Sequence, residues 1–424
     1  MKRNFILLCL LFFCWAIAHN LNPILIPQIK TLFQLTDFQS AWVDSAFYIA
    51  YTLFAIPAGY IIQKFGYKRG IQLGLLLFAL GAISTGYAAI MWIFPWALFS
   101  LFVLAIGLTL LETSANPLVA ISTEPSKSSQ QLTLAQSFNG LGATLAAFFG
   151  GQVIFNNPEL SKITIGQLNQ IKASAAPYEY SEILEDLALP VFITYFYVAA
   201  FIVLVLLLIS WLFNPKVNAI DPEIQSNNFT PKSENALKFL LSNKNFRLGM
   251  LALALYVGAQ IGVGSFFIRY SQEFTTATKK EASVLLSVGL LLFMSGRFIG
   301  SFLMKHIQPA KLLEICASTS ATLMIFAILT ANTNSPISGL YCLVLAQLFM
   351  SIMFPIIFSI SLEQIPNPPP LASSLLIMTI GGGALLPPTM GLISDLWGLN
   401  NAFILPTISF AFVSYFSNRM LKSK

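Results

Sequence analysis

One acidic residue, Glu112, stands inside an otherwise apolar stretch, GLTLLETSANPLVA. A carboxylate at the centre of a membrane helix costs about 2.5–3.5 kcal/mol and usually faces the bundle interior or a water-filled cavity. Burial favours the neutral acid, so a carboxyl there can exchange a proton while access alternates. The simpler alternative is a protonated acid bonded to a neighbouring helix. Asn116 lies one turn later on the same helix face.

Two amide side chains, Gln136 and Asn139, share one face of the next apolar segment, LTLAQSFNGLGATLAAFFGG. Amides offer both donors and acceptors, which suits recognition of a polyhydroxylated ligand. Hydrogen bonding between helices is the alternative, because such bonds are common in bundles. In LYVGAQIGVGSFFIRY, Tyr256 and Gln260 also share a face. We therefore expect Gln136, Asn139 and Gln260 to bind substrate, with Asn116 and Tyr256 as further candidates.

The first apolar segment contains AIAHNLNP, with His19, Asn20 and Asn22 followed by Pro23. Its basic start and the small residues before His19 also fit a secretory signal peptide. The apolar character resumes after Asn20 and continues to about Ile29. That length is normal for a membrane span and favours an uncleaved first helix.

Composition indicates a polytopic membrane protein. The chain is 56% hydrophobic with a mean hydropathy of +0.75, and only 9% of its residues are charged, compared with about 25% in ordinary proteins. The net charge is +6, but no basic cluster is long enough to suggest nucleic acid. Twelve apolar segments reach spanning length: 5–29, 41–63, 71–90, 95–121, 131–156, 188–213, 246–271, 282–304, 310–331, 336–362, 371–394 and 400–418.

Charge placement predicts the orientation. With both termini in the cytoplasm, the loops on that side hold 16 of the 23 Lys and Arg residues and the opposite loops hold five, as the positive-inside rule requires. The polar stretch 214–245 divides the chain into an N-terminal six-helix bundle (1–213) and a C-terminal one (246–424). Two such halves are typical of secondary transporters with a substrate site between them.

Enzyme motifs are absent from the sequence. Gly381-Gly382-Gly383 lies inside an apolar span without a preceding strand or a following Lys-Ser/Thr, so it does not fit a phosphate loop. With Pro387 and Pro388 it predicts a discontinuous helix. No metal-ligand cluster and no paired acids in a loop occur, so we expect no enzyme activity, no catalytic residues and no metal.

Several stretches together resemble the fucose–galactose–glucose:proton symporter family of the major facilitator superfamily. They include FFCWAIAHNLNPILIPQ, LLETSANPLVA, LTLAQSFNGLGA, YVGAQIGVGSFFIRY and MTIGGGALLPPTMGLISD, and they extend from the first span to the eleventh. The resemblance implies an all-α polytopic membrane protein with the major facilitator fold, 12 transmembrane helices in two six-helix bundles, and uptake of L-fucose or a related hexose with a proton. It places proton coupling on Glu112 and sugar binding on Asn20, Gln136 and Asn139.

The sequence departs from the family at one position. The family's first-span motif has an aspartate, its second carboxylate, where this chain has Pro23. Proline carries no proton and alters the local helix, whereas His19, four residues earlier, titrates near neutral pH. A sugar uniporter or a sodium-coupled transporter is therefore an alternative, and a non-transporting membrane sensor is a third. Beyond a coupling ion we expect no cofactor.

The expected partners are a small-molecule sugar and the lipid bilayer, with no nucleic acid, and the expected state is a monomer. We expect a multi-pass protein of the bacterial inner (cytoplasmic) membrane with both termini cytoplasmic.

Overall fold

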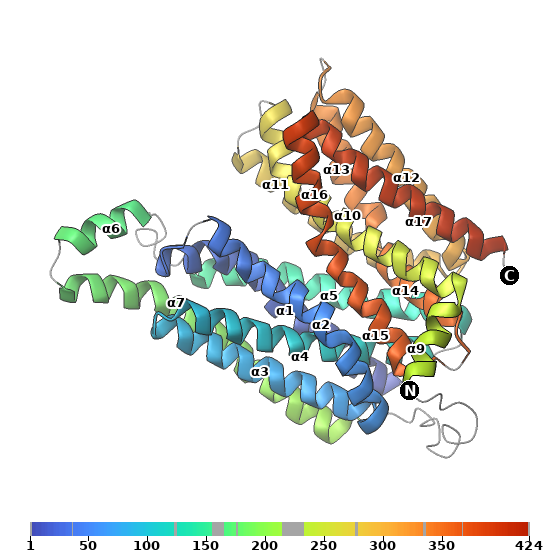
Figure 1. Cartoon of the computed structure of the whole chain (residues 1–424), viewed down its shortest axis with the longest axis horizontal. Helices are drawn as coiled ribbons and strands as arrows, with labels where there is room; N and C mark the ends of the chain where they lie inside the picture. Colours follow the sequence, from blue (N-terminus) through green and yellow to red (C-terminus); the bar gives the residue numbers. More distant parts are fainter. Residues whose placement is uncertain are drawn as a thin grey trace. The chain divides into compact units, whose positions relative to one another are not determined.

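The computed structural model describes the backbone of residues 2–35, 37–122, 125–154, 165–174, 177–213, 233–275, 279–333, 336–366 and 368–422. All regular structure within these ranges is helical (Figure 1). In the first two helices, the side chains of 2, 3, 18–28, 30 and 37–47 lie outside the described part. The predicted all-α class is confirmed for the described residues.

The N-terminal helices are long and correspond to the first six predicted spans. Their bounds are α1 Lys2–Leu32, α2 Asp37–Phe65, α3 Tyr67–Ile90, α4 Phe94–Ile121, α5 Pro125–Ile154, α6 Ile165–Ser174 and α7 Pro177–Leu212. The helix α6 is a short addition within the polar insert between the fifth and sixth spans. The sixth span is longer than predicted, because α7 begins in that insert rather than at 188.

The C-terminal helices follow the remaining predicted spans, but two of the spans are broken. The bounds are α9 Ser233–Ser242, α10 Lys244–Phe274, α11 Lys279–Leu303, α12 Pro309–Thr330, α13 Pro336–Met350, α14 Met353–Glu363, α15 Pro370–Met378, η2 Thr379–Ala384, α16 Leu386–Trp397, η3 Leu399–Phe403 and α17 Ile404–Lys422. Here η marks a 3-10 helix. The tenth span consists of α13 and α14, and the eleventh of α15, η2 and α16.

Nine stretches of the described chain are long and apolar enough to cross a membrane. They coincide with the predicted third, fourth and sixth to twelfth spans. The other three predicted spans lie on α1, α2 and α5, in each of which several residues have side chains outside the described part.

The chain forms two compact units, which are described separately. The first unit comprises Lys2–Ala115 and Phe138–Asn214, and the second comprises Asn116–Ser137 and Pro215–Lys424. The stretch 116–137 therefore groups with the C-terminal helices, although the predicted bundle boundary lies at 214–245. The bundle boundary stays a prediction.

Glycines bring α3 close to α4 in the first unit. A Cβ added to Gly107 would lie 2.6 Å from the carbonyl oxygen of Gly74, and one added to Gly81 would lie 2.5 Å from the backbone nitrogen of Leu104. Both distances are shorter than real Cβ contacts, so only glycine permits this approach. Small residues have this role in membrane bundles. The close approach fixes α4, which carries Glu112.

The discontinuous eleventh helix predicted from the glycine triplet is confirmed, since η2 separates α15 from α16. The triplet lies where η2 meets α10. A Cβ on Gly382 would lie 2.3 Å from the carbonyl oxygen of Ala254, and one on Gly258 would lie 2.9 Å from the carbonyl oxygen of Gly382. The glycines therefore permit close packing of two backbones.

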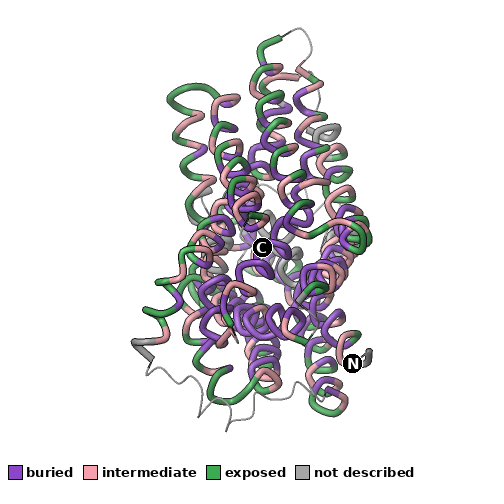
Figure 2. Tube along the Cα trace, turned by 90° about the vertical axis from the view of Figure 1, so that its right-hand side faces the viewer, coloured by how far each residue is buried: buried purple, intermediate pink, exposed green. Residues whose placement is uncertain are grey.

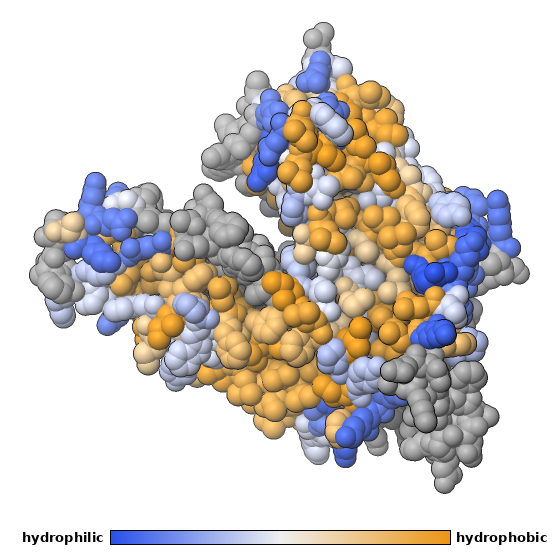
Figure 3. Space-filling view, in the orientation of Figure 1, coloured by the Kyte–Doolittle hydropathy of each residue, from blue (hydrophilic) through white to orange (hydrophobic). Residues whose placement is uncertain are grey.

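Large apolar side chains remain exposed on the outer faces of the helices. On α7, Trp211 is 84% exposed and Leu207 is 62% exposed. Buried and exposed residues alternate around most helices (Figure 2), and apolar residues cover the helix sides in the space-filling view (Figure 3). Such extensive apolar surface is compatible with a lipid environment rather than with water.

Candidate functional site

Glu112 receives a hydrogen bond from a neighbouring helix of the first unit. The hydroxyl of Tyr51 on α2 donates to Oε1 of Glu112 on α4, with an O–O distance of 2.7 Å. Tyr51 is 4% exposed and Glu112 is partly exposed. A buried tyrosine requires a polar partner for its hydroxyl, and the carboxyl supplies one. The bond joins α2 to α4 at the acid for which the sequence predicts proton coupling.

Asn139 lies where α5 packs against α1, also in the first unit. Its Nδ2 donates to the carbonyl oxygen of Phe12 over 3.3 Å. Nearby, a Cβ on Gly142 would lie 2.4 Å from the carbonyl oxygen of Phe13. The glycine thus allows α1 to approach α5 and brings a backbone acceptor within reach of the amide. This contact employs one donor of the Asn139 amide and ties α5 to α1.

Gln136 and Asn116 are brought together in the second unit. Nε2 of Gln136 donates to Oδ1 of Asn116 over 3.2 Å, and both residues are buried. Nδ2 of Asn116 is enclosed and has no hydrogen-bond partner among the described residues. An enclosed donor without a partner costs about 1–3 kcal/mol, so this nitrogen is suited to a ligand or a water molecule.

Arg297 on α11 is held by main-chain carbonyls. Its Nη1 donates to the carbonyl of Gln136 over 2.7 Å, and its Nε donates to the carbonyl of Ser351 over 3.2 Å. The guanidinium also lies 4.8 Å from the ring centroid of Phe293, within the range of a cation–π contact. The side chain is 7% exposed.

The break in the tenth span explains why these carbonyls are available. Pro355 lacks the N–H that would bond the carbonyl of Ser351, four residues earlier. The last carbonyls of α13 also lack helical partners. Arg297 donates a hydrogen bond to the Ser351 carbonyl, and its positive charge is favourable at the C-terminus of α13. The sequence predicts a tenth span at 336–362, which the structure contains, and Pro355 is the physical reason for the break within it.

Tyr256 on α10 supports the same break. Its hydroxyl donates to the carbonyl oxygen of Met350 over 2.8 Å, and the side chain is fully buried. The hydroxyl proton is therefore used within the protein. Gln260, one turn later, is partly exposed, and its amide has no hydrogen bond to the described residues. Of the two residues predicted from the sequence, Gln260 is therefore the one whose polar group can bind a substrate.

The polar positions of the first span lie on α1, which is helical through His19, Asn20, Asn22 and Pro23. Their side chains lie outside the described residues. The proposed sugar contact of Asn20 and the substitution of His19 for the missing acid therefore remain predictions.

Two polar residues at these sites were missed in the sequence. Tyr51 was overlooked because a sequence does not show which tyrosine meets a distant carboxyl. Gln347 on α13 is 4% exposed, and its amide has no hydrogen bond to the part of the chain that the structure describes. It packs against α11, where a Cβ on Gly289 would lie 3.1 Å from its Cγ. An amide inside a span is the same signal that selected Gln136.

The described residues contain no group of three or more His, Cys, Asp and Glu side chains that could hold a metal ion. The polar groups described above are an acid, a hydroxyl and an amide in the first unit, and amides, a hydroxyl and a guanidinium in the second. They can exchange hydrogen bonds and a proton, and amides with hydroxyls suit a neutral, polyhydroxylated ligand.

Comparisons with known proteins agree with one another. Residues 5–379 match the model of the Major Facilitator Superfamily. The chain is 36% identical to the L-fucose-proton symporter of Escherichia coli (strain K12) over 97% of its length and 92% of that protein. It is 33% identical to the glucose/galactose transporter of Brucella abortus over 96% of its length and 92% of that protein. A crystal structure of the transporter FucP in the outward conformation, 35% identical, superposes with a TM-score of 0.87 and 98% coverage of both chains.

Proposed function

Because this chain belongs to the major facilitator superfamily and, within it, to the family of the L-fucose-proton symporter and the glucose/galactose transporters, we propose that it imports a monosaccharide, L-fucose or a related hexose, with a proton by alternating access. The predicted fold class, with 12 helices in two six-helix bundles, is that of the superfamily. The observation that carries the proton-coupling role is the hydrogen bond between Tyr51 and Glu112.

Glu112 is the proposed proton carrier. As a carboxylate it accepts a charge-assisted bond from Tyr51, which is about twice as strong as a bond between neutral groups. Protonation weakens that bond and removes a charge that is costly inside the membrane. The link between α2 and α4 therefore responds to the proton. Uptake of the proton would therefore loosen the contact between α2 and α4, and its release would restore that contact.

The proposed sugar ligands are the amides. Asn116 has an enclosed nitrogen without a partner among the described residues, and Gln136 contacts it. Gln260 and Gln347 have amides without hydrogen bonds to the described chain, and Asn139 on α5 is a further amide in the proposed set. Sugar hydroxyls both donate and accept, so they can satisfy these groups. Asn20 is proposed as a further ligand, with Asn22 as a secondary candidate, whereas the hydroxyl of Tyr256 is bonded to the carbonyl of Met350.

The proposed arrangement in the membrane follows from the charges. The bundles 1–213 and 246–424, joined by 214–245, lie in the bacterial inner membrane with both termini in the cytoplasm. One chain contains both halves needed for alternating access, so a monomer suffices.

The coupling ion is tested in proteoliposomes. We expect sugar accumulation when a proton gradient is imposed and none with a sodium gradient alone. Because Pro23 replaces a family carboxylate, a uniporter is the second candidate, and it would equilibrate sugar under either gradient without accumulation. Accumulation driven by sodium would overturn proton coupling.

The sugar is identified by competition. Uptake of radiolabelled L-fucose is measured in the presence of unlabelled L-fucose, D-galactose, D-glucose and, as a control, mannitol, at two pH values. We expect a hexose to compete and mannitol to be without effect. Failure of every hexose to compete or to be taken up would overturn the sugar assignment.

A further inference from the structure

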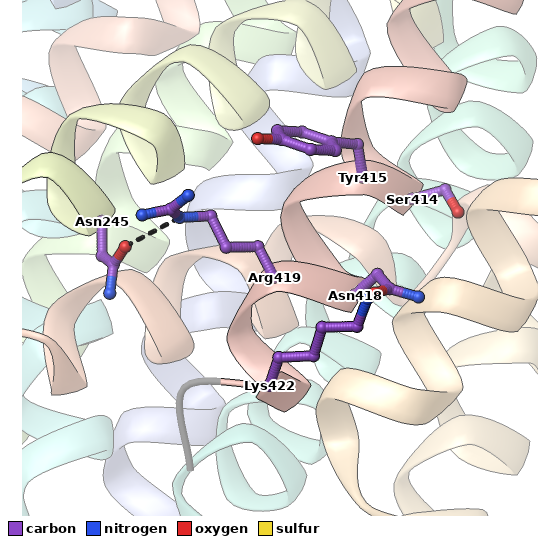
Figure 4. A pocket seen from close by; sticks show the side chains of 6 residues that line it. All are labelled: Asn245, Ser414, Tyr415, Asn418, Arg419 and Lys422. Carbon is purple, nitrogen blue, oxygen red and sulfur yellow. Dashed lines mark hydrogen bonds between the residues drawn. The ribbon is translucent and has the colours of Figure 1, made fainter.

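We propose that the cavity between the start of α10 and the end of α17 binds the phosphate headgroup of an anionic phospholipid. The cavity has a volume of about 600 Å³ and lies within the second unit. Its lining residues are Asn245, Ser414, Tyr415, Asn418, Arg419 and Lys422 (Figure 4). Such a site requires only that the chain lies in a bilayer, whichever sugar is transported.

The cavity offers donors and positive charge. Nε of Arg419 donates to Oδ1 of Asn245 over 3.1 Å and so holds the guanidinium toward α10 (Figure 4). No acceptor for its two terminal nitrogens is found among the described residues. Lys422 is exposed, and its Nζ has no hydrogen bond or ion pair within the same ranges. A guanidinium fork with free donors matches phosphate oxygens.

Glu314, an acid that bonds the lining residue Asn418, already has partners. Oε2 of Glu314 on α12 lies 2.6 Å from Nζ of Lys311, and its Oε1 accepts from Nδ2 of Asn418 over 2.8 Å. On α10, Lys244 and Arg247 are exposed close to Asn245 in sequence. The charged side chains of this region are therefore mainly cations. A basic pocket between membrane helices is the kind of site that binds anionic lipid headgroups.

The surface beside the cavity favours a lipid over a free phosphate ion. Ile404, Ile408 and Tyr415 on α17 are 38%, 57% and 55% exposed. Their spacing places them on one face of the helix, and continuing the same spacing leads to Lys422. An apolar stripe thus ends at a basic cavity. Acyl chains can follow the stripe while the phosphate meets Arg419, and tyrosine is favoured at the membrane–water boundary.

Lipid binding to the full-length purified protein tests the proposal. Native mass spectrometry measures the affinity for phosphatidylglycerol, for phosphatidylcholine and for inorganic phosphate. We expect Arg419→Gln combined with Lys422→Gln to weaken phosphatidylglycerol binding about 30-fold, because each basic residue near the surface contributes about fivefold. The matched control, Lys64→Gln with Lys305→Gln, removes two exposed positive charges elsewhere and is expected to have little effect.

Two further variants keep the test decisive if the double variant is unstable. Lys422→Gln alone changes an exposed side chain and is expected to weaken binding about fivefold. Arg419→Lys retains the charge but loses the guanidinium fork, so we expect it to weaken binding, though less than the double variant does. Equal losses in the double variant and its control would overturn the site. Inorganic phosphate bound as tightly as the lipid, with the same dependence on Arg419, would overturn the lipid as its occupant.

Discussion

Glu112 and Arg297 are both ionisable residues among apolar helices, yet their hydrogen bonds go to different kinds of group. In the first unit, Glu112 accepts a bond from the hydroxyl of Tyr51. In the second unit, Arg297 donates to the carbonyls of Gln136 and Ser351. A bond to a carboxyl changes with protonation, whereas a bond between a guanidinium and carbonyls does not. We therefore assign a coupling role to the first arrangement and an architectural role to the second.

Glu112→Gln gives the largest expected effect on transport. The amide preserves size and a hydrogen-bond acceptor but carries no exchangeable acid proton. We expect uphill accumulation to be abolished, so that sugar only equilibrates across the membrane, while sugar exchange survives. Uptake into proteoliposomes under an imposed proton gradient measures the first property, and counterflow of labelled sugar measures the second. Unchanged, pH-dependent accumulation would remove Glu112 from the coupling mechanism.

Arg297→Gln gives the largest expected effect on stability. The shorter side chain leaves the carbonyls of Gln136 and Ser351 without their donor, and the second cannot be bonded within the helix because of Pro355. We expect a loss of about 3 kcal/mol, seen as a lower midpoint of thermal unfolding in detergent. Arg269→Gln, on an exposed arginine of α10, is the control and should unfold near the wild-type temperature. Similar midpoints for the two variants would contradict the architectural role.

Tyr51→Phe tests the other member of the coupling pair. Removing the hydroxyl deletes its bond to Glu112 and leaves the ring in place. We expect proton-driven uptake to slow about tenfold, since a bond to a charged group contributes about 1.5 kcal/mol or more. The pH profile of uptake should also shift. Tyr60→Phe, an exposed tyrosine on the same helix, is the matched control. An unshifted pH profile in Tyr51→Phe would show that the pair is only structural.

Tyr256→Phe has the smallest expected effect. The hydroxyl donates to the carbonyl of Met350, so its loss should cost about 1 kcal/mol of stability and leave the KM for sugar unchanged. Thermal unfolding and initial uptake rates at several sugar concentrations measure the two quantities. A raised KM with unchanged stability would instead place Tyr256 among the sugar ligands.

The sequence was most informative about the membrane-spanning segments and least informative about which side chains form hydrogen bonds with one another. Apolar length located the spans, and the glycine triplet at 381–383 correctly indicated a discontinuous helix. A span that is apolar on all sides, however, does not show which face packs on which neighbour. For that reason neither the Tyr51–Glu112 bond nor the Gln136–Asn116 bond could be derived from spacing along the chain.

Two features, the break at Pro355 and the buried amide of Gln347, could have been predicted from the residues themselves. Pro355 removes a helical donor in the middle of the tenth predicted span, so the break between α13 and α14 was foreseeable. Gln347 is an amide in the same span, and the rule that selected Gln136 applies to it equally. By contrast, no single sequence shows which carbonyl a buried arginine will meet, because that depends on how α11 packs against α13.

The break at Pro355 also has a consequence for how the protein is made. The carbonyls at the end of α13 require donors from elsewhere, and an unsatisfied group in lipid costs several kcal/mol. Their donors, Tyr256 and Arg297, belong to α10 and α11, which precede α13 in the chain and so leave the ribosome first. The later helix therefore enters the membrane after its partners have been synthesised. We expect the order of the helices along the chain to favour correct assembly of this region during translation.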